Sequence, residues 1–171
     1  YKKNQTIFES PKKVDMICEP AEDVDYSKYE NYFDTIFTSP PYYNTEKYSD
    51  EDTQSWVRYK NIDSWNKDFL HSTLGKVIFT LKKDGVLAIN IADVYSAKAK
   101  DYFDICNPMN DYIKSQGLIY RGCIGMEMTK RFNSGGAGNA KSEYFEEHLK
   151  EKTKDTKDVA FGEPIWIWRK H

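Results

Sequence analysis

FDTIFTSPPY, residues 33–42, is the stretch of sequence that decides the fold. Its first six residues are mostly β-branched or aromatic, which predicts a strand over 33–38. The strand must end at Ser39, because the two prolines that follow cannot donate hydrogen bonds to a β-ladder. We therefore expect a rigid corner at the carboxyl end of a strand, where open α/β sheets bind their ligands.

The segments on either side alternate between strands and helices. Apolar runs predict further strands over 14–18, 86–91, 118–129 and 163–169, and residues 43–63 are interpreted as a long loop. An apolar stripe over 65–81 predicts a helix that Ser64 caps and that Gly85 closes. A second helix is expected over 108–116, with Gly117 as its C-cap.

This order of elements predicts an α/β fold in a single domain, 1–171. No clean crossover helix separates the strands at 118–129 and 163–169, so we expect them to pair as an antiparallel hairpin at the C-terminal end of the domain. The residues between them, 132–162, are predicted to be a polar insertion, and its charged part over 141–158 a solvated helix.

Composition excludes several classes of protein. The chain has 25 Lys and Arg against 27 Asp and Glu, so any contact with nucleic acid must use a local patch. No apolar run reaches the roughly 18 residues of a membrane span, so no membrane partner is expected. Cys18, Cys106 and Cys123 are widely spaced and the histidines lack ligand spacing. The sequence therefore predicts reduced thiols and no metal site. It also predicts a cytoplasmic location, or the host cytosol or nucleus for a viral protein.

The residues around the prolines resemble a known catalytic motif. TSPPY, residues 38–42, is similar to the (D/N/S)-P-P-(Y/F) motif of the amino-methylating DNA methyltransferases. A given five-residue string arises by chance in fewer than about one in a thousand chains of this length. The resemblance covers about residues 14–131 and 161–170. It implies a Rossmann-like sheet, incomplete at its N-terminal side, and methyl transfer from S-adenosylmethionine to an exocyclic amino group of a DNA base. Ser39 resembles the enzymes for cytosine N4 more than those for adenine N6.

The residue types at this corner also fit that chemistry on physical grounds. The exocyclic amine of a base is a poor nucleophile, because its lone pair is delocalised into the ring. Hydrogen-bond acceptors on its N–H bonds would localise the lone pair. The Ser39 hydroxyl and the Pro40 carbonyl are predicted to be these acceptors, and Pro41 is predicted to make the turn rigid. Tyr42 is predicted to stack on a base extruded from the duplex, for about 1–3 kcal/mol.

Residues near the first strands are expected to contact the cofactor. The resemblance implies cofactor contacts from Glu19, Pro20, Glu22, Asp23 and Thr38, and surface carboxylates remain the alternative for Glu22 and Asp23. The family's Gly-rich cofactor loop is not recognisable, because the glycines at 135–138 follow no apolar strand and resemble a flexible linker. We therefore expect that loop upstream of Tyr1 or in a second chain. Residues 1–171 alone are expected to bind S-adenosylmethionine weakly or not at all.

Other residues are assigned roles around the corner, each with a structural alternative. Nucleic-acid contacts are predicted for four residues: Tyr43, Arg58, Lys130 and Arg131. The alternatives are a packed aromatic loop for the first two and a solvated turn for the others. Asn90 and Asp93 lie at the C-terminal end of a buried strand and are predicted to line the site, with a helix cap as the alternative for Asp93.

Two other classes of function compete with DNA methylation. One is a methyltransferase that acts on RNA bases or on protein glutamine, although Ser39 in place of Asn argues mildly against glutamine. The other is a non-catalytic subunit that keeps the sheet and binds nucleic acid or a partner. The missing Gly-rich loop favours this second class, and the intact TSPPY motif argues against it.

Overall fold

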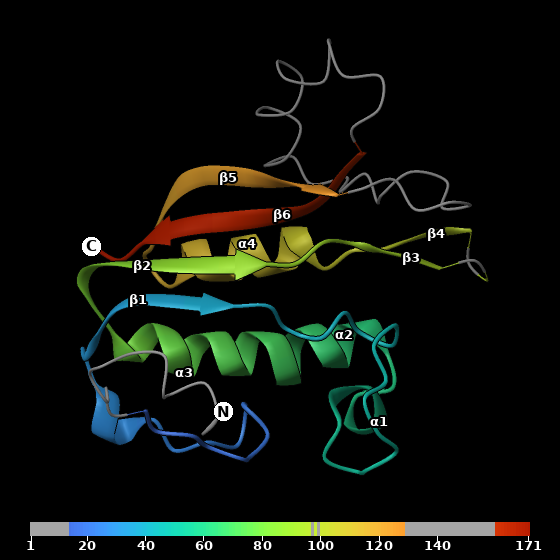
Figure 1. The fold of residues 1–171 in the computed structure, drawn as a ribbon, viewed down its shortest axis with the longest axis horizontal. Coiled ribbons are helices and arrows are strands. Elements are labelled where there is room, and N and C mark those ends of the chain that lie inside the picture. The colour runs from blue at the N-terminus through green and yellow to red at the C-terminus, as the bar shows by residue number, and fades with distance from the viewer. Residues whose placement is uncertain (1–13, 97, 99, 129–159) are drawn as a thin grey trace, which may run out of the picture.

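The computed structural model describes residues 14–96, 98, 100–128 and 160–171, and its centre is a four-stranded sheet in the order β1-β2-β6-β5 (Figure 1). The strands are β1 (Phe33–Thr38), β2 (Leu81–Asn90), β5 (Ile119–Met128) and β6 (Ala160–Arg169). β1 and β2 are parallel, and β6 runs antiparallel to both β2 and β5. This topology confirms the predicted α/β class and the antiparallel pair at the C-terminal end.

Most helices lie between β1 and β2 in the chain. They are α1 (Ser55–Arg58), α2 (Ile62–Ser64), the π-helical segment η3 (Trp65–His71) and α3 (Ser72–Thr80). The remaining elements are the 3-10 turn η2 (Ser27–Tyr29), the hairpin of β3 (Val94–Ser96) and β4 (Asp101–Phe103), and α4 (Cys106–Ser115). The sequence did not predict the β3–β4 hairpin. No helix in the described part of the chain is long and apolar enough to cross a membrane.

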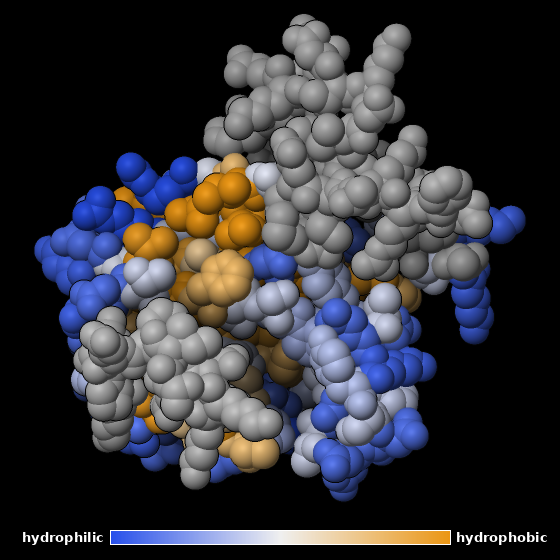
Figure 2. Space-filling view, in the orientation of Figure 1, coloured by the Kyte–Doolittle hydropathy of each residue, from blue (hydrophilic) through white to orange (hydrophobic). Residues whose placement is uncertain are grey.

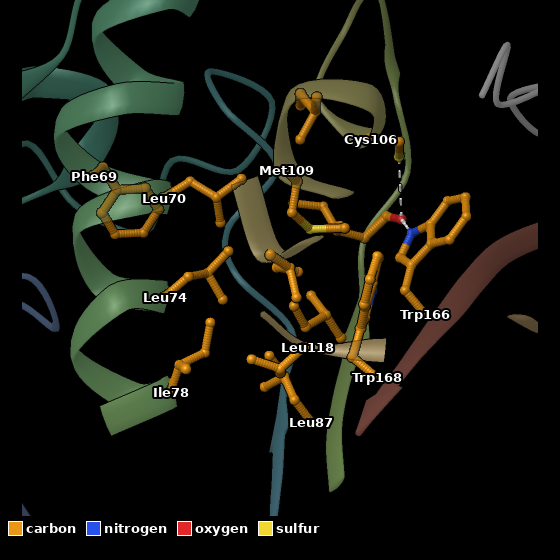
Figure 3. Close-up of a cluster of buried hydrophobic side chains, with 14 of the residues drawn as sticks. Phe69, Leu70, Leu74, Ile78, Leu87, Cys106, Met109, Leu118, Trp166 and Trp168 are labelled. Carbon is orange, nitrogen blue, oxygen red and sulfur yellow. Dashed lines mark hydrogen bonds between the residues drawn. The ribbon is translucent and has the colours of Figure 1, made fainter. Parts of the chain in front are cut away.

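The helices cover one face of the sheet. Figure 3 shows side chains of η3 and α3 pointing toward Leu87 of β2 and toward Trp166 and Trp168 of β6. Leu87, Trp166 and Trp168 are fully buried. Burying a large apolar side chain stabilises a fold by about 1.5–3 kcal/mol, so this layer holds the helices on the sheet. The apolar stripe predicted over 65–81 is therefore confirmed as the packing face of the helical segment.

A proline inside the sheet determines how β2 ends. The Ile91 N–H donates to the Pro164 carbonyl at 3.3 Å, but Pro164 has no N–H to donate in return. The indole N–H of Trp166 takes that place and donates to the Ile91 carbonyl at 2.9 Å, and the Cys106 thiol lies 3.6 Å from the same oxygen (Figure 3). These bonds tie the end of β2 to β6 and α4.

The opposite face of the sheet carries exposed apolar side chains. Phe37 of β1 is 63% exposed and Ile124 of β5 is 58% exposed. Figure 2 shows apolar surface over the region of β5 and β6. In addition, β1 pairs only with β2 among the described strands, so its outer edge has no described partner. Sheets with parallel strands are normally covered on both faces, so this side is suited to packing against further structure.

Two local predictions were wrong. Residues 14–18 form no strand: they pair with no described strand, and Val14, Met16 and Ile17 are exposed. The segment 43–63 contains the short helices α1 and α2, and it is therefore not one continuous loop.

The predicted limits of the long helix also need correction. The cap is Asn61, whose side chain accepts the Ser64 N–H at 2.8 Å, so the helix begins before Ser64. It ends at Thr80, because Leu81 is already extended and pairs with Phe33. Gly85 lies inside β2, where a Cβ would come within 2.8 Å of the Leu81 side chain. The predicted helix over 108–116 and its Gly117 cap are confirmed within two residues, with Gly117 at φ +83°. Most of the predicted insertion at 132–162 lies outside the described residues.

Candidate active site

The TSPPY corner lies at the carboxyl ends of two neighbouring parallel strands. Ser39 follows the last residue of β1, and Asn90 is the last residue of β2. The Ser39 Oγ lies 3.4 Å from the Asn90 Oδ1. Ser39 is exposed, whereas Asn90 is buried and its Nδ2 donates to the Pro164 carbonyl at 3.2 Å. The structure therefore brings together the predicted residues Ser39 and Asn90.

The backbone carbonyls of the corner differ in their hydrogen bonding. The Pro41 carbonyl accepts the Tyr43 N–H at 3.0 Å, and the Tyr42 carbonyl accepts the Thr45 N–H at 2.9 Å. Among the hydrogen bonds of the described residues, none reaches the carbonyl of Pro40, although this residue is buried. The Pro40 carbonyl, one residue after Ser39, thus remains an acceptor without a described donor.

Tyr42 is half-buried. Its ring packs against the edge of the hydrophobic core and its hydroxyl oxygen is buried, so only part of the ring is available to a ligand. Its backbone N–H donates to the Glu46 carboxylate at 3.0 Å, which braces the turn after the prolines. Sequence analysis missed Glu46, and a carboxylate four residues after the last motif residue was the available signal. Base stacking by Tyr42 stays a prediction.

Tyr43 belongs to the core and not to a DNA-facing surface. It is 5% exposed, and its hydroxyl donates to the Lys60 carbonyl at 3.0 Å. Its ring meets Trp65 and Phe103 edge-on, with centroids 6.0 and 5.0 Å apart. The β3–β4 hairpin, which carries Phe103, thus buries the ring that was predicted to contact nucleic acid. The packed aromatic loop is the alternative that the structure shows.

Arg58 joins two residues that were predicted to bind the cofactor. Its Nη1 lies 2.7 Å from the Glu22 Oε1 and 2.8 Å from the Asp23 Oδ2. The Tyr59 hydroxyl also donates to Glu22 at 3.1 Å, and Lys76 donates to the Glu22 backbone carbonyl. The Arg58 guanidinium therefore ties α1 to the segment before β1. In this conformation it contacts carboxylates instead of phosphate.

The comparison with protein families agrees with this architecture. The model of a family of N6 and N4 methyltransferases, described as DNA methylase, matches residues 33–160. The chain belongs to this DNA methylase family.

Solved structures of longer chains share the fold of this chain. Three structures of a protein assigned as a DNA modification methylase from Thermus thermophilus align with a TM-score of 0.54, one of them complexed with S-adenosyl-L-methionine. Their identity to this chain is 19%, 18% and 18% over 89%, 89% and 88% of its length. The chain spans only 52%, 53% and 51% of theirs, about half their length. A search of curated proteins finds no match.

The other residues predicted to contact the cofactor are Glu19, Pro20 and Thr38. Glu19 is exposed in the segment without regular structure, and the Pro20 carbonyl accepts the Asp23 N–H at 2.9 Å in a turn. Thr38 ends β1 directly before Ser39. An open cavity of about 530 Å³ lies between the Asp23 segment and α3, and no residue of the TSPPY corner lines it.

Asp93 caps the helix α4. Its Oδ1 accepts the N–H groups of Ile105 and Cys106, both at 2.9 Å, and these groups begin α4. Only 7% of Asp93 is exposed. The helix-cap alternative is therefore the one that the geometry shows. Lys130 and Arg131 lie outside the described residues, so their predicted contact with nucleic acid stays a prediction.

Tyr59 offers a test of its contact with the Glu22 carboxylate. Burial, followed by the charge and hydrogen bond of Glu22, raises the pKa of Tyr59 to about 12. Because the pKa is near 10 in the unfolded chain, this tyrosine makes folding less favourable as the pH rises from about 10 to about 12. We expect Glu22→Gln to lower the Tyr59 pKa only part of the way toward 10, since burial remains, and to lessen that loss of stability.

NMR titration of ring-labelled tyrosine, assigned with Tyr59→Phe, measures this pKa. Asp34→Asn is a suitable control, because it removes the ion pair of Asp34 with Lys82 and none of the contacts of Tyr59. An unchanged Tyr59 pKa in Glu22→Gln would show that the carboxylate does not reach the phenol.

Proposed function

We propose that this chain is the catalytic part of a methyltransferase that transfers a methyl group from S-adenosylmethionine to an exocyclic amino group of a DNA base. One observation carries the proposal: the Ser39 hydroxyl and the Pro40 carbonyl, which accepts no described hydrogen bond, stand together at the carboxyl end of β1. Membership of the DNA methylase family supports the reaction class. The same two acceptors would suit RNA bases, which the assay below includes.

The two oxygens act on the nitrogen of the substrate. One N–H of the base donates to the Ser39 hydroxyl oxygen and the other to the Pro40 carbonyl oxygen. Both hydrogen bonds strengthen as the nitrogen becomes tetrahedral and positive, so they favour the transition state over the ground state. The target base must leave the duplex to reach this corner. The exposed part of the Tyr42 ring would then hold it by stacking.

S-adenosylmethionine would supply a methyl group already activated on a sulfonium. The described residues meet only part of its requirements, because Arg58 engages the side chains of Glu22 and Asp23 and no Gly-rich loop accompanies them. We therefore derive no step for the methionine end of the cofactor. The outer edge of β1, which has no partner among the described strands, and the exposed Phe37 support a further segment or a second chain that completes the pocket.

Calorimetry tests whether another segment or chain is needed to complete the cofactor pocket. Titration of S-adenosylmethionine into residues 1–171 is expected to give no measurable binding. Micromolar binding would contradict the need for another segment.

The contacts of Arg58 with Glu22 and Asp23 also favour the competing function, a non-catalytic subunit. Such a subunit would bind DNA without ever methylating it.

A methylation assay tests the function itself. The full protein is incubated with S-adenosylmethionine and either DNA or RNA, and the digested nucleosides are identified by mass. We expect N4-methylcytosine in DNA, since Ser39 supports cytosine, and N6-methyladenine would correct only the choice of base. The absence of any methylated nucleoside with the full protein would reject the enzymatic function.

A further inference from the structure

We infer that Asn90 is a positioning residue that sets which way the Ser39 hydroxyl points. This inference rests on the proposed function, because Ser39 serves the reaction only when its oxygen accepts from the amine. The starting observation is the contact between the Ser39 Oγ and the Asn90 Oδ1, at 3.4 Å. That distance is long for an O–H···O bond, and such contacts often tighten when the substrate binds.

The orientation of the Asn90 amide follows from its second contact. A backbone carbonyl can only accept, so the group that meets the Pro164 carbonyl at 3.2 Å must be the NH2 of Asn90. The amide oxygen then faces Ser39. Because this oxygen can also only accept, the Ser39 hydroxyl is the donor in the contact between them.

The amide is held in this orientation by the sheet. The Pro164 carbonyl also accepts the Ile91 N–H at 3.3 Å, and Asn90 pairs with Ile165 across β2 and β6. Trp166 donates to the Ile91 carbonyl at 2.9 Å. Asn90 itself is 7% exposed, so water does not compete strongly for its oxygen. The side chain therefore presents a fixed acceptor to Ser39.

The direction of the Ser39 hydroxyl matters for the chemistry. When its hydrogen points to Asn90, the lone pairs of Oγ are free to accept an N–H of the base. Without Asn90 the hydroxyl can rotate and donate to the amine nitrogen. Such a bond would occupy the lone pair that must attack the methyl group, so the same serine would then oppose the reaction.

The contact can be tested without catalysis. The side-chain amide signals of Asn90 are followed by NMR in the protein and in Ser39→Ala, which removes only the hydroxyl of an exposed residue. We expect the Asn90 signals to shift and those of Asn110 to stay in place, since Asn110 instead accepts from Trp168 at 3.1 Å. Unchanged Asn90 signals would overturn the inference. This measurement stands even if the proposed methylation is not found.

A double-mutant cycle tests the consequence for catalysis. We expect Asn90→Ala to lower kcat by about 10- to 100-fold with an unchanged KM for S-adenosylmethionine. The double variant with Ser39→Ala should fall no further than Ser39→Ala alone, within about threefold, because Asn90 acts through Ser39. Losses that multiply in the double variant would overturn the inference.

Asn110→Ala provides the matched control. Asn110 is fully buried and bonded to a tryptophan of β6, so its loss should lower stability while leaving kcat unchanged. An equal fall in kcat for Asn110→Ala would mean that the effect of Asn90→Ala reports a loosened fold, and that result would also reject a positioning role.

Discussion

Replacing Ser39 with alanine is expected to lower kcat for methylation about 100- to 1,000-fold. The physical reason is the loss of one of the two acceptors that localise the amine lone pair in the transition state. The substitution leaves the fold intact, since Ser39 is exposed and follows the last residue of β1. The KM for S-adenosylmethionine should stay the same, because the proposed mechanism places the serine against the base and not against the cofactor.

Steady-state kinetics with the full protein measure this effect. Ser39→Asn is the informative companion, because its amide oxygen is again an acceptor and should retain more activity than alanine. Ser115→Ala, an exposed serine at the end of α4, should behave like the parent. Full activity in Ser39→Ala would remove the central step of the proposed mechanism.

The second large effect concerns stability. Asp93→Ala is expected to lower the free energy of unfolding by about 2–4 kcal/mol, because two buried N–H groups at the start of α4 lose their acceptor. Both donors, on Ile105 and Cys106, are fully buried, so water cannot replace the carboxylate. Urea unfolding followed by circular dichroism measures the change.

Asp93→Asn separates the cap from a role in catalysis. The asparagine oxygen can still accept from the helix, so this variant should keep most of the stability that alanine loses. If Asp93→Ala unfolds like the parent but loses methylation, the residue would return to the site-lining role that its position in the sequence suggested.

Residues whose role depends on neighbours in the chain were predicted well. The limits of β1 follow from five β-branched or aromatic residues and two prolines, all within a short stretch. The α3 region follows from one apolar stripe. The antiparallel pairing of β5 and β6 follows from a sequence between them that carries no clean crossover-helix pattern. Each of these is a local preference that tertiary packing reinforces.

Residues whose role depends on distant partners were predicted poorly. Tyr43 follows the motif directly, yet Phe103, which is far along the chain, decides that its ring is buried. Arg58 was expected on phosphate, and its carboxylate partners Glu22 and Asp23 lie 35 or more positions away. The strand predicted over 14–18 also did not form, because an apolar run becomes a strand only where it pairs with another, and these residues pair with no described strand.

The sequence by itself determined the chemistry at the corner, since a hydroxyl, a proline carbonyl and an aromatic ring are properties of consecutive residues. Only the tertiary structure decided which of these groups are available and how they are oriented. It uses Asp93 as a cap and buries Tyr43, and it places Asn90 against Ser39. The physical reason is that hydrogen bonds and burial depend on distances in space. Ser39 and Asn90 are 51 positions apart in the sequence, and the parallel pairing of β1 with β2 brings them together.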